Sequence, residues 1–394
     1  MNGLIADFDA IVAGGGVSGL LAAKEMASSK LSVAIMEEDL EIGIPEKCAG
    51  LISVKALTSL GLFPSRRIVK NEIKRALIVS PLGSKAEINA TKQGVIALNR
   101  REFDRELASM AEREGAIIEL GQRVTSVEDH EEFVKIRTAK QERKAKILVD
   151  ARGLSSLNQE QKAGILQSAQ YDIRGEWFEK DRVEVYPDNS ATPGFPMWVI
   201  PLDDDTARLG VAGYGINPLA HLDKFVENHG ARIIKKSVSP IFIGGASKSF
   251  VQGNIVAVGD AAGQTKPTTG GGIFTGGIGA ILAGRAISKC LLGNDPLALR
   301  DYEVEWRRAF GREFMIMSQA RRVYERVDNK TMDKMIRVLA SPKILDKISN
   351  ESDFDYHSIG ISQTLSMIKE HPLLALDLIK IGANVVLDLL KGSP

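Results

Sequence analysis

Three glycines near the start of the chain have the spacing that phosphate binding requires. Gly14, Gly16 and Gly19 form a G-x-G-x-x-G turn directly after residues 9–13, which are expected to form a short buried strand. In such a turn the first glycine allows the tight bend, and the second lets a pyrophosphate approach the backbone. The third lets helix and strand pack closely. The spacing therefore predicts a strand, a phosphate-binding turn and a helix in that order.

The residues on either side of this turn extend the prediction from a phosphate to a dinucleotide. A helical run starts at Val17 and Ser18, and its N-terminus directs N–H donors and positive potential toward phosphates. The next apolar strand ends at Glu37, with Glu38 beside it. A carboxylate at that place can accept a hydrogen bond from a ribose hydroxyl.

Two later segments have the same strand-to-turn chemistry. Asp150 ends an apolar strand and is followed by Gly153 in an Asp-Ala-x-Gly turn, and Gly259 precedes Asp260 at the end of another. A carboxylate at a strand end can bind the ribityl chain of a flavin.

The polar loop after Asp260 leads to Gly270, Gly271 and Gly272, which open a helix at Ile273. Such a helix N-terminus can stabilise the negative charge that a flavin ring acquires on reduction. In this order and separation the pieces resemble the FAD-dependent oxidoreductases of the p-hydroxybenzoate-hydroxylase fold. The resemblance implies an α/β protein that combines a Rossmann-type FAD-binding domain with a β-sheet substrate domain and a helical C-terminal region.

The separation of the flavin-binding segments predicts a discontinuous cofactor domain. We expect residues 1–70, 95–158 and 250–300 to build the FAD-binding domain, 71–94 and 159–249 an antiparallel-sheet substrate domain, and 301–394 a helical region.

Alternating strands and turn signals mark the substrate domain. Residues 72–98 alternate in places, with a turn signal at Pro81-Leu82-Gly83. Asp203-Asp204-Asp205 should form a hairpin turn between the strand 198–202 and the strand 207–212. A long charged helix is predicted over 302–326.

A closer resemblance rests on the loop 41–53, which contains the sequence Pro-Glu-Lys-Cys-Ala-Gly. This loop is similar to the Pro-x-x-Cys loop of archaeal geranylgeranyl reductases, and the loop 260–273 is also similar to that family. The resemblance implies that Cys48 and Ala49 lie near the flavin. It also places Arg100, in an Arg-x-x-Phe-Asp element, in a flavin-contacting position, and we count Val124 among the cofactor contacts.

The chain departs from this family at the strand that lines the prenyl cavity. The family has a Tyr-x-Trp-x-Phe-Pro element, in which Trp198 and Pro201 match. Pro196 stands in place of the tyrosine, and Ile200 in place of the phenylalanine. We expect Trp198 and Pro201 to contact a prenylated lipid substrate, whose exact identity the departure leaves open.

Reduction of an isolated C=C bond needs a hydride from the reduced flavin and a proton from the other side. Cys48 is the thiol in the expected active-site loop, and an ordinary thiol is mostly protonated at neutral pH. It can act as the proton donor, orient the substrate or simply fill space; Cys290 should only pack. The sequence leaves the electron donor open between NAD(P)H and a ferredoxin-like carrier.

The amino-acid composition limits the partners, metals and cell compartments that this protein can be expected to have. The 51 basic and 50 acidic residues give a net charge of +1, so nothing favours nucleic acid as a partner. Two cysteines imply no disulfide framework, and five histidines in no ligand pattern argue against a metal. We expect a cytoplasmic enzyme without an export signal, and with no uninterrupted run of the roughly 20 apolar residues that a spanning helix needs.

The segment 371–392 is expected to form a helix with one narrow polar stripe on an apolar cylinder. The stripe consists of Asp377, Lys380, Asn384, Asp388 and Lys391. Such a helix is either buried in the core or lies on the inner face of the cell membrane as a peripheral contact.

Other functions fit the same fold. An aromatic monooxygenase would use NAD(P)H and oxygen without a second dinucleotide fingerprint. A flavin-dependent halogenase would carry a Trp-x-Trp-x-Ile-Pro motif, of which only the second half is present because Pro196 replaces the first tryptophan. A module that binds FAD without catalysis is the remaining alternative.

Overall fold

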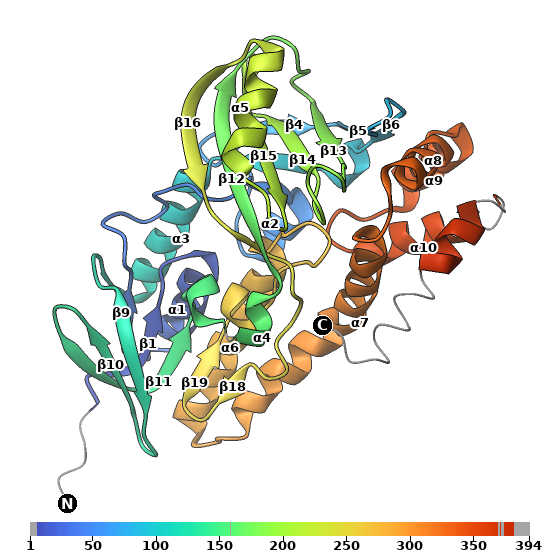
Figure 1. Cartoon of the computed structure of the whole chain (residues 1–394). Coiled ribbons are helices and arrows are strands. Elements are labelled where there is room, and N and C mark those ends of the chain that lie inside the picture. The colour runs from blue at the N-terminus through green and yellow to red at the C-terminus, as the bar shows by residue number, and fades with distance from the viewer. Residues whose placement is uncertain (1–5, 158, 369–370, 372–373, 382–394) are drawn as a thin grey trace, which may run out of the picture. The chain divides into compact units, whose positions relative to one another are not determined.

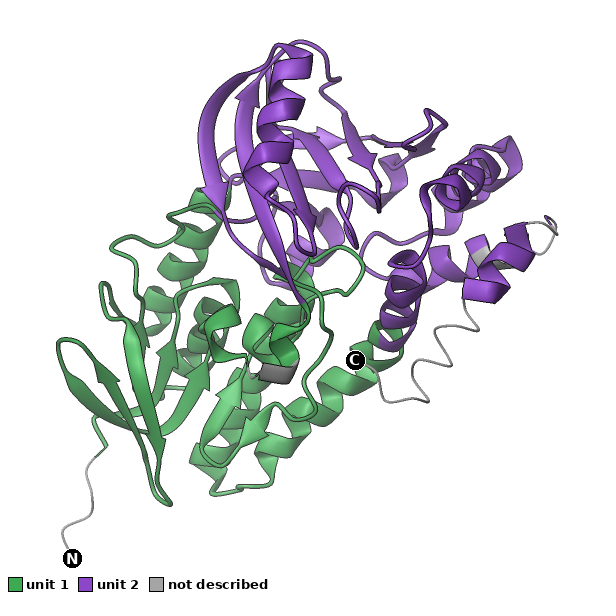
Figure 2. Cartoon of the chain, in the orientation of Figure 1, with its two compact units in different colours: residues 1–46, 100–164, 242–314 green, residues 47–99, 165–241, 315–394 purple. Residues whose placement is uncertain are grey.

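The computed structural model describes residues 6–157, 159–368, 371 and 374–381. The chain is divided into two compact units, each assembled from three separated segments (Figure 2). Unit 1 comprises residues 1–46, 100–164 and 242–314, and unit 2 comprises residues 47–99, 165–241 and 315–394.

The elements of unit 1 are mostly short strands, with helices between some of them (Figure 1). The strands are β1 (Phe8–Ala13), β2 (Val33–Met36), β8 (Ile117–Glu119), β9 (Val124–Asp129), β10 (Val134–Thr138), β11 (Glu142–Asp150), β18 (Val251–Gln252) and β19 (Ile255–Ala257). The helices are α1 (Val17–Ser28), α3 (Arg100–Glu114), α4 (Gln159–Lys162), α6 (Ile273–Gly293) and the first part of α7 (Ala298–Tyr324).

The central sheet of unit 1 has the strand order β18-β19-β11-β1-β2-β8, and the strands from β19 to β8 run in parallel. Its register places Met36, Ala13, Asp150 and Ala257 in one row. The loops that follow these four strands therefore leave the sheet at the same edge. In open parallel sheets the carboxyl edge is where ligands bind.

Unit 2 is built on strands with one face against a helix (Figure 1). Its strands are β3 (Leu51–Ser53), β4 (Val69–Ile73), β5 (Arg75–Val79), β6 (Lys85–Asn89), β7 (Val95–Leu98), β12 (Ile165–Arg174), β13 (Arg182–Tyr186), β14 (Met197–Pro201), β15 (Thr206–Gly213) and β16 (Arg232–Val238). The short β17 (Ile241–Phe242) pairs with β12 and crosses the boundary between the segments. The helices are α2 (Val54–Ser59), α5 (Pro218–His229), α8 (Asn329–Leu339), α9 (Pro342–Glu351), α10 (His357–Ile368) and the end of α7.

The large sheet of unit 2 has the order β16-β12-β15-β14-β13-β5-β6, and β3, β7 and β4 form a separate small sheet. The large sheet departs from the expected antiparallel pattern at one place, because β13 and β5 pair in parallel. The two strands are far apart in the sequence, so no hairpin turn dictates their direction. The predicted hairpin at Asp203-Asp204-Asp205 is confirmed, because β14 pairs with β15. The turn at Pro81-Leu82-Gly83 joins β5 to β6, which also pair.

Alternation along β14 gives the large sheet two apolar faces. Val199 packs with Leu209 and with Leu222 of α5 on one face. Ile200 and Trp198 belong to the cluster on the other face, together with Ala97 of the small sheet. Successive side chains of a strand point to opposite faces, which is why neighbours in this strand join different clusters.

Candidate active site

The glycine turn of unit 1 has the geometry that its spacing predicted. Gly14 has a φ of +109°, and a Cβ there would lie 2.4 Å from the carbonyl oxygen of Ala151. A Cβ on Gly19 would lie 2.0 Å from the carbonyl oxygen of Gly14, so helix and strand approach as closely as their backbones allow. A Cβ on Gly16 would meet nothing within 4 Å, and Gly16 caps α1 without a side-chain hydrogen bond. The helix N-terminus therefore presents its N–H groups beside open space, which suits a pyrophosphate.

The predicted ribose-binding acid holds the same turn. The carboxylate of Glu37 accepts hydrogen bonds from the backbone N–H of Gly15 at 2.5 Å and of Asp39 at 2.8 Å. A carboxylate has about four acceptor sites, so these two bonds leave capacity for a ribose hydroxyl. Glu38 instead lies 3.4 Å from Arg123 in an exposed ion pair.

The turn after β11 places Asp150 beside Ala13, as the register requires. Its carboxylate accepts hydrogen bonds from Arg152 at 2.8 and 2.9 Å and from Ser156 at 2.7 Å. Burial raises the pKa of Asp150, but these hydrogen bonds outweigh burial and hold the pKa below its usual value. Gly153, with a φ of +61°, begins the short 3-10 turn that brings Ser156 back to the carboxylate.

The Gly259-Asp260 turn follows β19 at the same sheet edge. Asp260 accepts a hydrogen bond from the Thr265 hydroxyl. Burial raises the pKa of Asp260, while that hydrogen bond and the charge of Arg100 act in the opposite direction. Gly259 has a φ of +62°, and a Cβ there would lie 2.5 Å from the Ser18 hydroxyl oxygen. Ser18 and Gly259 are therefore brought together, although 240 positions separate them in the sequence.

Two polar residues that the sequence analysis did not single out support this turn. Gln264 is fully buried, accepts a hydrogen bond from the N–H of Gly259 at 2.9 Å and donates to the hydroxyl of Tyr302 at 2.8 Å. Thr265 is also buried. In the sequence, these two residues belong to a short polar loop between two glycine-rich turns. The polar character of a loop does not indicate which of its side chains point inward.

The glycine-rich segment 270–272 leads directly into α6 at Ile273. Gly272 caps this helix without a side-chain hydrogen bond, and a Cβ there would lie 3.1 Å from a carboxylate oxygen of Asp260. Because Gly270 and Gly271 have no side chains, neither residue covers the backbone N–H groups at the start of α6. Asp260 and the N-terminus of α6 thus share one edge of unit 1.

The remaining predicted contacts of unit 1 differ in their surroundings. Arg100 pairs with Asp104 at 3.0 Å on the first turn of α3, and both side chains are largely buried. Burial raises the pKa of Asp104, and Arg100 opposes that shift. Val124 begins β9 and packs against the core cluster that contains Ile11 and Leu148.

Cys48 and Ala49 lie at the start of the first segment of unit 2, and Cys48 is half-buried. Ala49 packs in the same cluster as Trp198. Arg208, which the sequence analysis missed, fixes this loop: its Nη1 donates to the carbonyl oxygens of Ala49 at 3.1 Å and Leu98 at 3.2 Å. Its signal was a charged residue within the otherwise apolar strand β15.

Trp198 and Pro201 occupy β14, on the sheet that carries this cluster. A Cβ on Gly210, the cross-strand partner of Trp198, would lie 2.2 Å from the indole, so the ring occupies the space that a side chain at this position would need. The ring of Phe195 makes an edge contact with Trp198 at a centroid distance of 5.9 Å. The carbonyl oxygen of Pro201 accepts a hydrogen bond from Asn71 at 3.0 Å. Trp198 thus lies on the sheet face that also holds Ala49, whereas Pro201 ends the strand.

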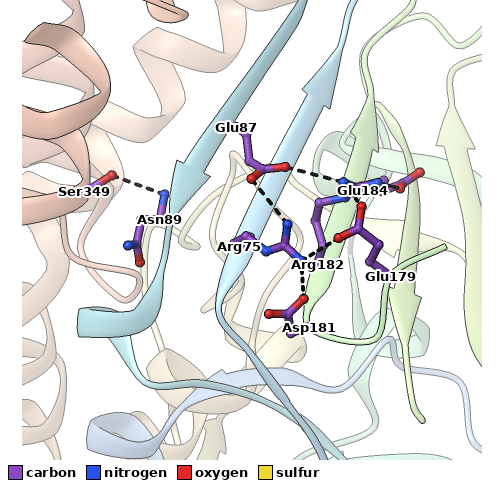
Figure 3. Close-up of polar contacts among 8 residues, drawn as sticks. All are labelled: Arg75, Glu87, Asn89, Glu179, Asp181, Arg182, Glu184 and Ser349. Atoms are coloured by element: carbon purple, nitrogen blue, oxygen red, sulfur yellow. Dashed lines mark hydrogen bonds and ion pairs between the residues drawn. The ribbon is translucent and has the colours of Figure 1, made fainter. Parts of the chain in front are cut away.

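Charged side chains bridge the parallel pair of strands in the same sheet (Figure 3). Arg75 of β5 contacts Glu179 at 2.6 Å and Asp181 at 2.5 Å, just before β13 begins. Arg75 and Arg182 of β13 both contact Glu87 of β6 at 3.5 Å. Most of these groups are partly exposed, so each pair contributes little to stability. Their arrangement instead favours the observed register of β13 beside β5.

Within the described part of the chain, no group of three or more histidine, cysteine or acidic residues is arranged to hold a metal ion. One described helix, α6, is long and apolar enough to cross a membrane by length and composition alone, and half of that stretch is buried inside the protein. Because α6 packs along α1, a core helix accounts for this composition.

Comparison with known proteins agrees with this architecture. A family model described as tryptophan halogenase matches residues 72–321. Digeranylgeranylglycerophospholipid reductase 1 of Methanopyrus kandleri is 30% identical over 88% of this chain and 97% of its own length.

Two solved structures share the fold. A geranylgeranyl bacteriochlorophyll reductase-like protein from Thermoplasma acidophilum superposes with a TM-score of 0.82 at 23% identity, covering 95% of this chain and 99% of its own. The p-nitrophenol 4-monooxygenase of Pseudomonas putida superposes with a TM-score of 0.67 at 15% identity, covering 89% and 98%. The chain therefore belongs to the family that the tryptophan halogenase model describes and to the digeranylgeranylglycerophospholipid reductase family.

Proposed function

We propose that this chain is an FAD-dependent reductase that saturates C=C bonds of geranylgeranyl chains in membrane lipids or their prenyl precursors. The observation that carries the proposal is the identity to a digeranylgeranylglycerophospholipid reductase along nearly the whole length of both proteins. The carboxyl edge of the unit 1 sheet supports it with the turns that such a cofactor needs.

The residues of unit 1 fit FAD. We assign the pyrophosphate to the N-terminus of α1 at Gly16 and the adenosine ribose to Glu37. The ribityl chain is assigned to Asp260, and the ring to the N-terminus of α6 at Gly272. The open space over Gly16 and two helix N-termini without side-chain caps support this assignment.

We assign the substrate to unit 2, on the face of the large sheet that holds Trp198 and Ala49. Apart from the buried Arg208, the side chains of this face are largely apolar, as a prenyl chain requires. Arg208 holds the backbone at Ala49, the residue that follows Cys48. Chain connectivity keeps Cys48 two residues from the end of the first segment of unit 1.

Alkene reduction adds a hydride to one carbon and a proton to the other. Reduced FAD supplies the hydride when it is bound. The Cys48 thiol donates the proton at Sγ or orients the alkene toward a proton-donating water. NAD(P)H or a ferredoxin-like carrier regenerates the reduced cofactor. The enzyme works in the cytoplasm and makes peripheral contact with the membrane that holds its lipid substrate.

Two measurements test this function. The purified protein should be yellow with about one FAD per chain, and Glu37→Ala should weaken FAD more than FMN, which lacks the adenosine ribose. Under anaerobic conditions with chemically reduced flavin, mass spectrometry should detect prenyl lipids that have gained two hydrogens per reduced bond. A stable colourless protein that cannot be reconstituted with FAD would exclude the proposal.

Halogenation or aromatic hydroxylation is the second candidate, favoured by the tryptophan halogenase match and by the monooxygenase fold likeness. Pro196 replaces the first tryptophan of the halogenase motif and weighs against halogenation. Stoichiometric oxygen uptake with a hydroxylated or halogenated aromatic product, and no reduction of prenyl lipid, would favour this candidate over the reductase.

A further inference from the structure

Arg321 is a buried arginine in the last turns of α7 (Figure 1). The residue is 5% exposed, and its Nε donates to a carboxylate oxygen of Glu325 at 2.8 Å. Its Nη2 is buried and has no hydrogen-bond partner among the described residues. A buried donor of a charged group without a partner costs folding free energy, so such a group calls for a ligand or an ordered water.

The guanidinium lies against the loop that precedes β14. A Cβ on Gly194 would lie 3.2 Å from Nη2, so the glycine makes room for it. The guanidinium carbon lies 5.5 Å from the ring centroid of Phe195, which in turn contacts Trp198. Arg321 is thereby linked through one aromatic ring to the residue that we assign to the prenyl chain.

Two more buried donors around this loop have no partner among the described residues, the hydroxyl of Tyr324 and the indole N–H of Trp198. The guanidinium of Arg321 lies 5.9 Å from the Tyr324 ring. Burial raises the pKa of Tyr324, so its hydroxyl stays protonated and available as a donor at neutral pH. The Tyr214 hydroxyl lies against Arg321 and Glu325, and the Asp188 carboxylate acts on Tyr324, so two carboxylates also face this cluster. Nη2 of Arg321, the Tyr324 hydroxyl and the Trp198 N–H nevertheless remain three buried donors that an acceptor-rich anion would satisfy.

We propose that Arg321 binds a phosphate-ester oxygen in the polar headgroup of the lipid substrate, with Tyr324 as a second donor. This inference rests on the proposed function, because it extends the site at Trp198 to the head of the same molecule. A guanidinium binds phosphate through paired N–H donors, and Glu325 occupies only the Nε edge. We favour a lipid phosphate over a free phosphate because the buried ring of Phe195 and the ring of Trp198 continue the cluster with apolar side chains.

The test compares binding of two saturated lipids with the same phytanyl chains, one a diphytanylglycerol phosphate and the other neutral diphytanylglycerol. Because neither lipid can be reduced, the result does not depend on the reductase activity. Wild-type protein should bind the phosphate ester at least tenfold more tightly. Arg321→Gln should lower that preference by about 10- to 100-fold, the scale of a lost charge-assisted hydrogen bond, and leave the affinity for the neutral lipid unchanged.

Arg312→Gln, at an exposed arginine of the same helix, is the matched control and should keep the full preference. Glu325→Gln removes the competing carboxylate and should maintain or strengthen the preference. Because Glu325→Gln keeps Arg321, it still tests the site if Arg321→Gln does not fold. Inorganic pyrophosphate distinguishes the source: if it binds as tightly as the lipid phosphate, the site recognises a free anion and the lipid assignment is wrong.

Equal binding of both lipids by the wild type would overturn the proposal and indicate that a water satisfies Nη2. Loss of affinity for both lipids in Arg321→Gln would show that the arginine is only structural. A separate assay with the unsaturated lipids should change KM rather than kcat in Arg321→Gln. Headgroup preference without any hydrogenation would leave the anion site standing and refute the reductase function.

Discussion

Cys48 is the residue at which chemistry and folding can be separated, because it is half-buried in a loop and its neighbour Ala49 is held by Arg208. If the thiol donates the proton or orients the alkene, Cys48→Ser should keep FAD and the fold. Alkene reduction should nevertheless slow by about 10²-fold or more, the scale of losing a general acid, because a serine hydroxyl is a much weaker acid. Cys48→Ala should be at least as impaired.

The measurement is single-turnover reoxidation of the reduced flavin by the prenyl substrate. Cys290→Ala is the control, because Cys290 lies half-buried on α6 and should affect neither step. An unchanged rate in Cys48→Ala would remove Cys48 from the mechanism and leave it as packing.

We expect the buried carboxylate of Asp260 to lower the stability of the cofactor-free protein and to strengthen FAD binding. Its pKa is raised mainly by burial, so its contribution to stability is complete below the unfolded pKa of about 3.9 and is lost as the pH rises through the folded pKa. Asp260→Asn should therefore raise the melting temperature of the cofactor-free protein at pH 7 more than at pH 4. FAD affinity should fall by about tenfold because a charge-assisted hydrogen bond is lost.

Asp150→Asn is the control of opposite sign. Burial raises the pKa of Asp150, but hydrogen bonds from Arg152 lower it overall, so its stabilisation is present above about pH 3.9 and is lost as the pH falls through the folded pKa. Its asparagine variant should lower the melting temperature at pH 7 and have little effect well below pH 3. Equal shifts of the same sign in both variants would contradict the assignment.

At the scale of elements, the packing of α6 on α1 positions the N-terminus of α6. A Cβ on Gly284 would lie 2.7 Å from the Cβ of Glu25 and 2.9 Å from the carbonyl oxygen of Ala22. Gly284→Ala should therefore force the helices apart, destabilise the protein by about 1–3 kcal/mol and weaken FAD by moving Gly272.

Gly293→Ala is the matched control, because a Cβ at that last residue of α6 meets nothing within 4 Å. It should stabilise the protein by about 0.5–1 kcal/mol, since alanine restricts the unfolded chain more than glycine does. Melting curves and FAD titrations check both variants. If Gly284→Ala is as stable as Gly293→Ala, the close approach does not determine the position of α6.

At the scale of the whole molecule, the expected C-terminal helix falls only in part on described residues. Residues 374–381 are helical, while Asn384, Asp388 and Lys391 lie outside the described part of the chain. Leu378 and Ile381 pack against a cluster that contains Met332 and Ile336 of α8. Leu376 and Ile379 are 53% and 65% exposed. This part of the segment thus has both a packed face and an exposed apolar face.

We expect substitutions on the packed face and on the exposed face of this segment to have different effects, which two leucines can test. Leu378→Ser should destabilise the protein by about 2 kcal/mol, because it removes apolar surface from the α8 cluster. Leu376→Ser should leave the melting temperature nearly unchanged and reduce liposome association if the exposed face contacts a membrane. Unchanged liposome association in Leu376→Ser would argue against that membrane contact, and unchanged stability in Leu378→Ser would argue against core packing.

Several parts of the fold followed from the sequence because they depend on neighbours in the chain. The strand-turn-helix around Gly14, the hairpin at Asp203 and the long helix predicted over 302–326 are confirmed by β1 and α1, by β14 and β15, and by α7. Turn sterics and the periodicity of apolar residues act over a few positions, so the sequence by itself carries this information. The assignments of Cys48 and Trp198 to the reaction come from the family resemblance and remain predictions.

Contacts between distant segments were decided only by the tertiary structure. The parallel pairing of β13 with β5, the close approach of Gly259 to Ser18, and the bonds from Arg208 to Ala49 and Leu98 have no local signature. In the sequence, a buried arginine in a strand cannot be distinguished from an exposed charged residue until the carbonyl groups that it binds are known. The sequence determined which turns and strands form and that a dinucleotide suits them, because these follow from local sterics. The tertiary structure decided which buried polar groups meet, because burial and hydrogen bonding depend on segments more than 100 residues apart.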